Sequence, residues 1–372
     1  MTTGSNKAVR ISVTDLSADI TSNDTAVTDW VSRYFGSWWN AAPVADGTAA
    51  VQISATVDSH HAQHIANQID RTRHETFQYA RKPMRLVRDC GSVLAHDGHV
   101  AYHVMPDGPI TIAGHDAGRV ASAASRLARE ALRGRLAAAG WVLLHASAVV
   151  DHHARAWVAF GSKAAGKTST ALQLTRATNW SMLANDRLFA RSNQAGDIEV
   201  LPWPAAAAIG LGILTAGGWY DTIAAARDQL HSSTPDEMLA ALAGGVREPM
   251  QADGRELKAQ LFPDQLTSLL GIPLAATATI GTVLLPTIDS RAQRATIKPS
   301  HRLLTAEHNA FHADIEDRYP PIWGLRQNET PHAQAAVFEK LNKLPRWALT
   351  LTHDIETNRI SLTTLTKLPQ GE

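Results

Sequence analysis

The chain has 372 residues, 44% of them hydrophobic, and its 35 basic and 35 acidic side chains give a formal net charge of zero. This length can hold two domains, and the hydrophobic content is normal for a folded protein and too high for a disordered one. The balanced charge argues against nucleic-acid partners and against an anionic membrane surface, because binding to either favours a basic excess. Cys90 is the only cysteine, and no segment has the apolar pattern of a signal peptide or membrane span, so we expect a cytoplasmic protein without internal disulfides.

The first part of the chain, residues 7–115, predicts an α+β region. Strand patterns occur at 8–13, 49–53 and 99–104, and the aromatic-rich segment between the first two indicates core packing or a domain contact. His60 and His64 are spaced so that a helix would bring them to one face. Solvated histidines are the simpler interpretation of that pair, and a zinc site is the alternative.

A long helix is predicted over 117–139, where apolar residues recur at helical spacing, and Gly140 ends it. We interpret its five arginines most simply as a solvated face, and contact of some of them with a partner is the alternative: Arg119, Arg126, Arg129, Arg133 and Arg135. We place the domain boundary before this helix. The result is a smaller N-terminal α+β domain over 1–116 and a second domain over 117–372.

After the long helix, the second domain continues with the elements of a phosphate site. Strands are predicted at 141–144 and 156–160, the sequence GSKAAGKT occupies 161–168, a helix follows, and a strand over 180–184 comes next. This order of strand, loop, helix and strand predicts an α/β fold with a mixed sheet. Further along, 201–218 is predicted to be irregular and to form an active-site wall, 221–275 to be helices and loops, and 280–285 and 347–352 to be strands.

The segment 161–168 matches G-x-x-x-x-G-K-[ST], a pattern typical of a phosphate-binding loop. Its glycines let successive N–H groups turn inward, and the helix N-terminus behind them adds positive potential. Lys167 is expected to reach the β- and γ-phosphates, and the Thr168 hydroxyl to bind Mg²⁺. The predicted nucleotide-binding residues are Gly161, Ser162, Lys163, Ala164, Ala165, Gly166, Lys167, Thr168 and Ser169.

Two residues outside the loop complete the predicted site. His145 precedes the loop by one strand hairpin, and Asp186 follows it at the end of a hydrophobic strand. An acidic residue in that position commonly binds Mg²⁺ or serves as a base in nucleotide-binding sheets. The alternatives are a core histidine and a turn aspartate paired with Arg187. Three later residues could add a cation for the phosphates or be ordinary surface charges: Arg247, Arg255 and Lys258.

The order strand, histidine, hairpin, GSKAAGKT, helix and a strand ending in NDR resembles the HPr kinase/phosphorylase superfamily. The sequences LHASAV at 144–149 and LPRWAL at 344–349 are most similar to HPr-kinase-related tailoring kinases of peptide natural-product (lasso peptide) clusters. The resemblance covers about residues 141–190. It implies a P-loop sheet of the HPr kinase and phosphoenolpyruvate carboxykinase type, with activity toward a serine hydroxyl.

The resemblance also implies residue roles. Asp186, His145 and Lys167 would be catalytic, and Thr168 and Asp186 would hold the metal. The first aspartate of the family's motif, its usual general base, corresponds to Asn185 here, and an amide cannot take a proton at neutral pH. Either Asp186 takes that role, or base catalysis contributes little to a loose phosphoryl transfer.

We therefore expect a kinase that uses ATP and Mg²⁺ to phosphorylate a hydroxyl of a peptide, protein or small metabolite. A catalytically silent ATP-binding regulator is the alternative, and it would explain Asn185. A sensor or scaffold acting through the N-terminal domain is a third, weaker interpretation. The sequence does not identify the acceptor, and it leaves homo-oligomer formation open.

Overall fold

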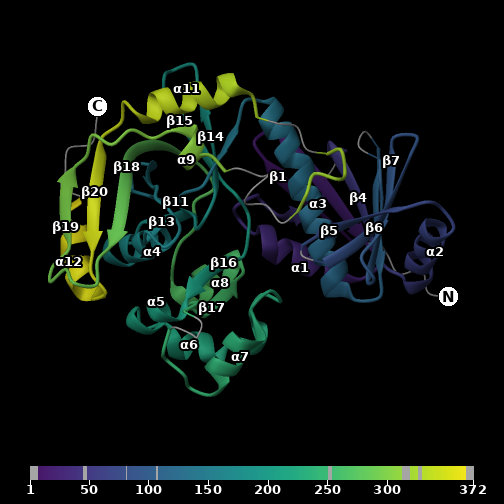
Figure 1. Ribbon diagram of the computed structural model, residues 1–372, viewed down its shortest axis with the longest axis horizontal. Coiled ribbons are helices and arrows are strands. Elements are labelled where there is room, and N and C mark those ends of the chain that lie inside the picture. The colour runs from purple at the N-terminus through teal and green to yellow at the C-terminus, as the bar shows by residue number, and fades with distance from the viewer. Residues whose placement is uncertain are drawn as a thin grey trace. The chain divides into compact units, whose positions relative to one another are not determined.

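The computed structural model describes residues 7–44, 48–80, 82–105, 108–249, 254–311, 319–325 and 329–365. The chain forms two compact units (Figure 1). The first unit consists of Met1–Ala139 and His312–Glu329, and the second of Gly140–Phe311 and Thr330–Glu372. Each unit is a mixed sheet with packed helices, so the chain has the mixed α/β architecture expected from its sequence.

The first unit has a sheet with the strand order β3-β1-β2-β4-β9-β8-β7-β6-β5. The pairs β2–β4 and β4–β9 are parallel, and the other neighbours are antiparallel. The strands are β1 Lys7–Val13, β2 Leu16–Ser22, β3 Ala42–Pro43, β4 Val51–Val57, β5 Glu75–Tyr79, β6 Lys82–Asp89, β7 Ser92–His96, β8 Val100–Val104 and β9 Ile110–Gly114. The helices are α1 Thr25–Phe35, α2 Ser59–Asp70 and α3 Ala117–Ala138. The strands predicted at 8–13 and 99–104 are confirmed, and the one predicted at 49–53 begins later and runs to Val57.

Helix α3 belongs to the first unit. The boundary between the units therefore lies after this helix, between Ala139 and Gly140, and not before it at 116/117 as predicted. Its apolar stripe, with Val120, Ala124 and Leu127 fully buried, packs against α1 and strands β4 and β9. The helix itself is confirmed within one residue of its predicted range. Periodicity located the helix, but which sheet covers its apolar stripe depends on contacts distant in sequence.

The central arginines of α3 do not form the expected solvated face. Arg129 and Arg133 are only 8% and 5% exposed. Arg129 donates a hydrogen bond to Tyr34, and the guanidinium of Arg126 lies 4.5 Å from the ring centre of Tyr319. Hydrogen bonds and aromatic faces offset the cost of removing these cations from water. The arginines near the helix ends are exposed: Arg119 and Arg135.

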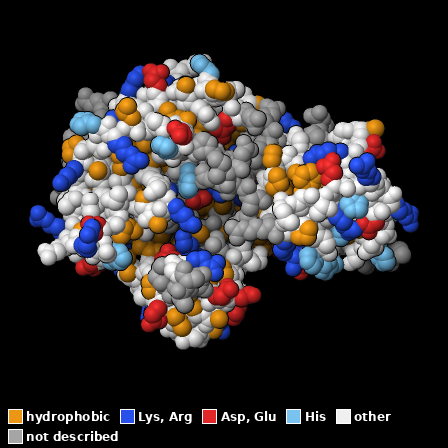
Figure 2. All heavy atoms as spheres, viewed as in Figure 1, with side chains coloured by type: hydrophobic (Ala, Val, Ile, Leu, Met, Phe, Trp, Pro, Cys, Tyr) orange, Lys and Arg blue, Asp and Glu red, His pale blue; other side chains and the backbone are white. Residues whose placement is uncertain are grey.

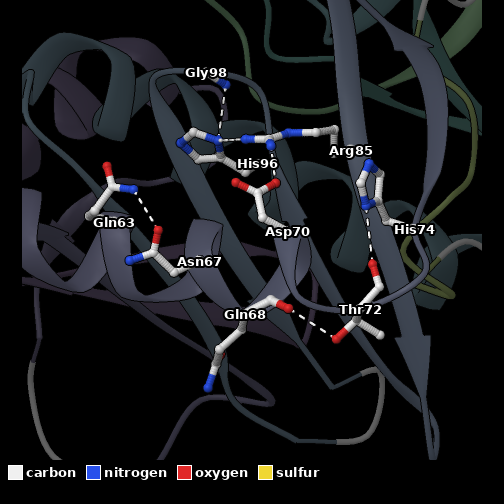
Figure 3. A network of polar contacts seen from close by, with 9 residues as sticks. All are labelled: Gln63, Asn67, Gln68, Asp70, Thr72, His74, Arg85, His96 and Gly98. Carbon is white, nitrogen blue, oxygen red and sulfur yellow. Dashed lines mark hydrogen bonds and ion pairs between the residues drawn. The ribbon is translucent and has the colours of Figure 1, made fainter.

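Polar contacts join the end of α2 to strands β6 and β7 (Figure 3). Asp70 forms an ion pair with Arg85, and Nη2 of Arg85 lies 3.2 Å from Nδ1 of His96. Since Arg85 can only donate, Nδ1 of His96 accepts and the imidazole is neutral. Burial and the charge of Arg85 lower the pKa of His96 accordingly. On α2 itself, His60 and His64 are exposed to solvent.

The second unit has a sheet with the order β10-β14-β15-β18-β12-β11-β13, extended by β20 on β18 and by β19 on β20. Strand β18 pairs in parallel with β12 and β20. The strands are β10 Val142–Leu144, β11 Ser147–Val150, β12 Arg155–Ala159, β13 Ser181–Ala184, β14 Leu188–Ser192, β15 Ile198–Pro202, β18 Ala278–Ile288, β19 Thr296–Pro299 and β20 Arg346–Leu351. All five strands predicted in this region are present, with ends shifted by a few residues.

Helices pack on this sheet and place the site. Helix α4 (Lys167–Thr178) follows β12 and packs against β11, β13 and α12 (Ile355–Leu365). Helix α11 (Pro331–Leu341) adds Val337, Phe338 and Leu341 to a core cluster that contains alternate residues of β12. A short helix, α9 (Ala306–Asn309), contacts α11.

A smaller layer of the second unit is built on the two-stranded sheet of β16 (Ala207–Gly210) and β17 (Lys258–Leu261). Its helices are α5 Leu211–Ala216, α6 Tyr220–Ala225, η1 Arg227–Gln229, α7 Asp236–Ala243 and α8 Pro263–Leu270. The prediction that 201–218 is irregular is therefore wrong, and β17 was not foreseen. Both strands are short and depend on a partner far away in sequence, which a local pattern does not reveal.

The surface agrees with the balanced composition. Figure 2 shows basic and acidic side chains interspersed over the face in view. Within the described ranges, no helix combines the length and the apolar character needed to cross a membrane.

Candidate functional site

The 161–168 loop joins β12 to α4, as predicted, and its shape depends on glycine at two positions. Gly166 caps α4 with a φ of 95°, and a Cβ there would lie 2.9 Å from Cγ1 of Ile288. At Gly161 a Cβ would lie 2.8 Å from Cβ of Ala165. Ala164 also has a positive φ, 66°, so the backbone curls back tightly before the helix.

Replacing Gly166 by alanine is expected to weaken ATP binding at least tenfold, because a left-handed residue with a Cβ costs about 1–2 kcal/mol and the contact with Ile288 displaces the loop. Isothermal titration calorimetry with ATP measures the effect. Gly196→Ala is the matched control, since Gly196 has a similar φ of 98° and a Cβ there would have no neighbour within 4 Å. The control should lose stability without losing ATP affinity. Unchanged ATP affinity in Gly166→Ala would contradict the role of this loop.

The N-terminus of α4 is open to an anion. Gly166 has no side chain, so the N–H groups of the first turn receive no side-chain cap. Lys167 is 8% exposed, and its Nζ donates to the carbonyl oxygens of Gly161 at 2.7 Å and Ser162 at 3.1 Å. A lysine charge and the positive end of a helix therefore lie together.

Two hydroxyl groups donate hydrogen bonds to the backbone carbonyl of Asn185. Thr168 donates to this oxygen at 3.2 Å, and Ser147 donates to it as well. A hydroxyl that donates its hydrogen keeps its lone pairs, so the Thr168 oxygen can still bind a hard cation. The side-chain Oδ1 of Asn185 is buried and accepts no hydrogen bond from the described residues.

Asp186 is engaged on both carboxylate oxygens. Its Oδ1 lies 3.4 Å from Nε2 of His145, and its Oδ2 accepts from Nε of Arg187 at 3.1 Å. Partial burial raises the pKa of Asp186, but the hydrogen bond with His145 and the charges of Arg187, His145 and Lys167 outweigh it and lower the pKa to about 2. Such a carboxylate is ionised at neutral pH and is a weak base, which suits cation binding better than proton abstraction.

These residues line one cavity of about 600 Å³ in the second unit. His145, Asp186 and residues 163–169 all contribute to it, whereas Gly161 and Ser162 take part through their carbonyl contacts with Lys167. Residues within the predicted wall also line this cavity: Ala208, Gly210, Gly212, Ile213 and Ala216. The structure thus brings together the loop, the histidine and the aspartate that were singled out by sequence.

Other lining residues carry no sequence motif. Gln173 of α4 is 5% exposed, and its Oε1 accepts no hydrogen bond from the described residues. The connection between β20 and α12 contributes Thr352 and His353. Asn358, fully buried, holds this connection by donating to the Thr352 carbonyl at 2.9 Å and accepting from its N–H at 2.8 Å. Helical spacing from Ser169 is the one signal that could have suggested Gln173.

Of the three candidate cations, Lys258 lines the cavity. Arg247 instead forms an ion pair with Asp221, at 2.6 Å, and its guanidinium lies 4.0 Å from the ring centre of Tyr220. Arg255 is exposed and is not among the described residues that line the cavity.

Comparison with known proteins does not assign a family: no protein-family model matches the chain, and no curated protein matches it. Function is therefore inferred from the geometry and chemistry of the cavity, together with the sequence resemblance over 141–190.

Proposed function

We propose that the protein is an ATP- and Mg²⁺-dependent phosphotransferase of the HPr kinase type that phosphorylates a hydroxyl group, with serine in a peptide or protein as the favoured acceptor. One observation carries the proposal. The open N-terminus of α4, Lys167 and the Asp186–His145 pair all belong to a single cavity.

The loop supplies the binding site for the phosphates. Backbone N–H groups at the start of α4 bind phosphate oxygens without needing a charged side chain. When ATP binds, the amino group of Lys167 leaves the carbonyl oxygens of Gly161 and Ser162 and contacts the β- and γ-phosphates. Its positive charge there offsets the negative charge of the transferring group.

The residues present fit Mg²⁺, which prefers oxygen ligands. The hydroxyl oxygen of Thr168 and the ionised carboxylate of Asp186 would hold it. When bound, the metal neutralises charge on the β- and γ-phosphate oxygens. His145 and Arg187 keep the Asp186 carboxylate in place through one hydrogen-bonded contact to each oxygen.

A catalytically silent ATP-binding regulator is the second candidate, favoured by two features of the site. Asn185 stands where the related kinases have their usual base, and Asp186 is a weak base because of its low pKa. Such a protein would bind ATP without consuming it.

Incubation with Mg²⁺, [γ-³²P]ATP and a panel of serine-containing peptides separates these candidates, with ADP release and ATP binding measured in parallel. The kinase proposal expects label on a serine hydroxyl. Stable ATP binding with neither label transfer nor ADP release would favour the regulator. Failure to bind ATP at all would overturn both.

A further inference from the structure

The two residues that follow β13, Asn185 and Asp186, do not present a carboxylate that is free to bind an acceptor hydroxyl. Asn185 carries an amide, and both oxygens of Asp186 contact His145 and Arg187. An acceptor hydroxyl bound in the cavity therefore needs another group to orient it and receive its proton.

A second carboxylate lines the same cavity from a different element. Among the described lining residues the acidic ones are Asp186 and Glu256, and Glu256 lies just before β17. Within the described chain, the side chain of Glu256 forms neither a hydrogen bond nor an ion pair. Its carboxylate is thus available to a ligand in the cavity.

The position of this carboxylate is tied to a glycine on the neighbouring strand. A Cβ on Gly210 would overlap Oε1 and Cδ of Glu256 and would lie 2.7 Å from its Oε2. The φ of Gly210 is −68°, an ordinary value for any residue, so the backbone does not require glycine here. The missing side chain makes room for the Glu256 carboxylate on this wall of the cavity.

The backbone around Glu256 is held on both sides. Leu257 accepts from the N–H of Leu211 at 2.8 Å and donates to the carbonyl of Pro249 at 3.0 Å. Lys258, paired with Gly210 in the sheet, also lines the cavity. Residues two apart on an extended segment point the same way, which agrees with Glu256 and Lys258 both facing the cavity.

We propose that Glu256 is a catalytic residue that binds the acceptor hydroxyl and takes its proton during phosphate transfer. This inference rests on the proposed kinase function. The hydroxyl oxygen forms a bond to the γ-phosphorus, and the bond from that phosphorus to the β,γ-bridging oxygen breaks. The bridging electrons leave with ADP, and the hydroxyl proton passes to Glu256 and then to water.

Glu256→Gln keeps the size of the side chain and removes its ability to take a proton. We expect kcat for peptide phosphorylation to fall about 100-fold, with the Kd for MgATP within about twofold of wild type. Glu256→Asp should recover part of the loss. Glu237→Gln, an exposed carboxylate of α7 outside the described cavity lining, should match wild type. An unchanged kcat in Glu256→Gln, or a loss explained by weaker MgATP binding, would overturn the proposal.

Gly210→Ala tests the placement of the carboxylate. The added Cβ meets the flexible end of Glu256, so the protein should fold while the carboxylate is displaced, and kcat should fall as in Glu256→Gln. Thermal unfolding checks the fold. In a Glu256→Ala background, adding Gly210→Ala should change kcat little. Equal losses from Gly210→Ala with and without Glu256 would contradict the placement.

The wild-type protein separates this inference from the function on which it rests. Absence of phosphate transfer by wild type defeats the kinase proposal and the role of Glu256 together. Transfer by wild type that survives Glu256→Gln defeats the role of Glu256 alone.

Discussion

Lys167→Ala is expected to abolish phosphate transfer, with kcat reduced by at least about 10³-fold, because it removes the loop's buried charge from the transferring phosphate. Lys167 is nearly enclosed and lies at the start of α4, where the helix N-terminus adds to its effect. Single-turnover transfer from [γ-³²P]ATP to a serine peptide measures the loss.

The control for this prediction lies in the same loop. Lys163 also lines the cavity but is not specified by the phosphate-loop pattern, so Lys163→Ala should cost less than about tenfold. Circular dichroism of both variants excludes misfolding. Wild-type activity in a folded Lys167→Ala variant would refute the loop's assignment.

Asp186→Asn is expected to reduce transfer by about 10²- to 10³-fold, far more than Asn185→Ala. The first change removes the negative charge that His145 and Arg187 hold in the cavity. The second removes a side-chain amide but leaves the Asn185 backbone carbonyl, which accepts from Thr168 and Ser147. The variants therefore compare loss of a charge with loss of a neutral group at adjacent positions.

Steady-state rates at several Mg²⁺ concentrations test this comparison. If Asp186 binds the metal, excess Mg²⁺ should restore part of the activity of Asp186→Asn and none of the small loss in Asn185→Ala. Equal losses in the two variants would move the role from Asp186 to His145, which contacts the same carboxylate.

The pKa of about 2 for Asp186 also predicts how the stability of the protein depends on pH. Because the folded pKa lies below the ordinary value near 3.9, the charged form of Asp186 is favoured by folding. Any stability it adds is present above about pH 4 and is lost as the pH falls toward 2. Acid unfolding of Asp186→Asn, followed by tryptophan fluorescence, should therefore show less pH dependence than wild type in this window.

How far the sequence could predict the site differs among its parts. The 161–168 loop and α4 were predictable because glycine, lysine and threonine act there through local backbone geometry. Asp186 was predictable for a related reason, since the end of a hydrophobic strand is visible in the sequence. Glu256 was not, because it lies beside β17, a strand with no local pattern of its own. Gln173 and Thr352 lie in or at the end of predicted elements, but the sequence does not show that these elements face one cavity.

Helix α3 also combines features that the sequence predicts with features that it does not. The spacing of Val120, Ala124 and Leu127 predicted its extent and its apolar stripe, both of which the structure contains. The spacing could not tell that Arg129 and Arg133 are buried as well, or that the helix packs in the first unit. Periodicity reports how side chains are arranged around one helix, not what covers each face.

By itself, then, the sequence determined the features that depend on neighbouring residues: the strand–loop–helix of the phosphate loop, the main strands of the second unit, and the long helix. Tertiary structure alone decided where the units divide, how β16 and β17 pair, and which side chains share a cavity. The reason is physical. Short-range geometry follows from backbone preferences and side-chain spacing, whereas a cavity wall depends on which distant segments pair and pack. Gly210, for example, pairs with Lys258 and lies against the carboxylate of Glu256.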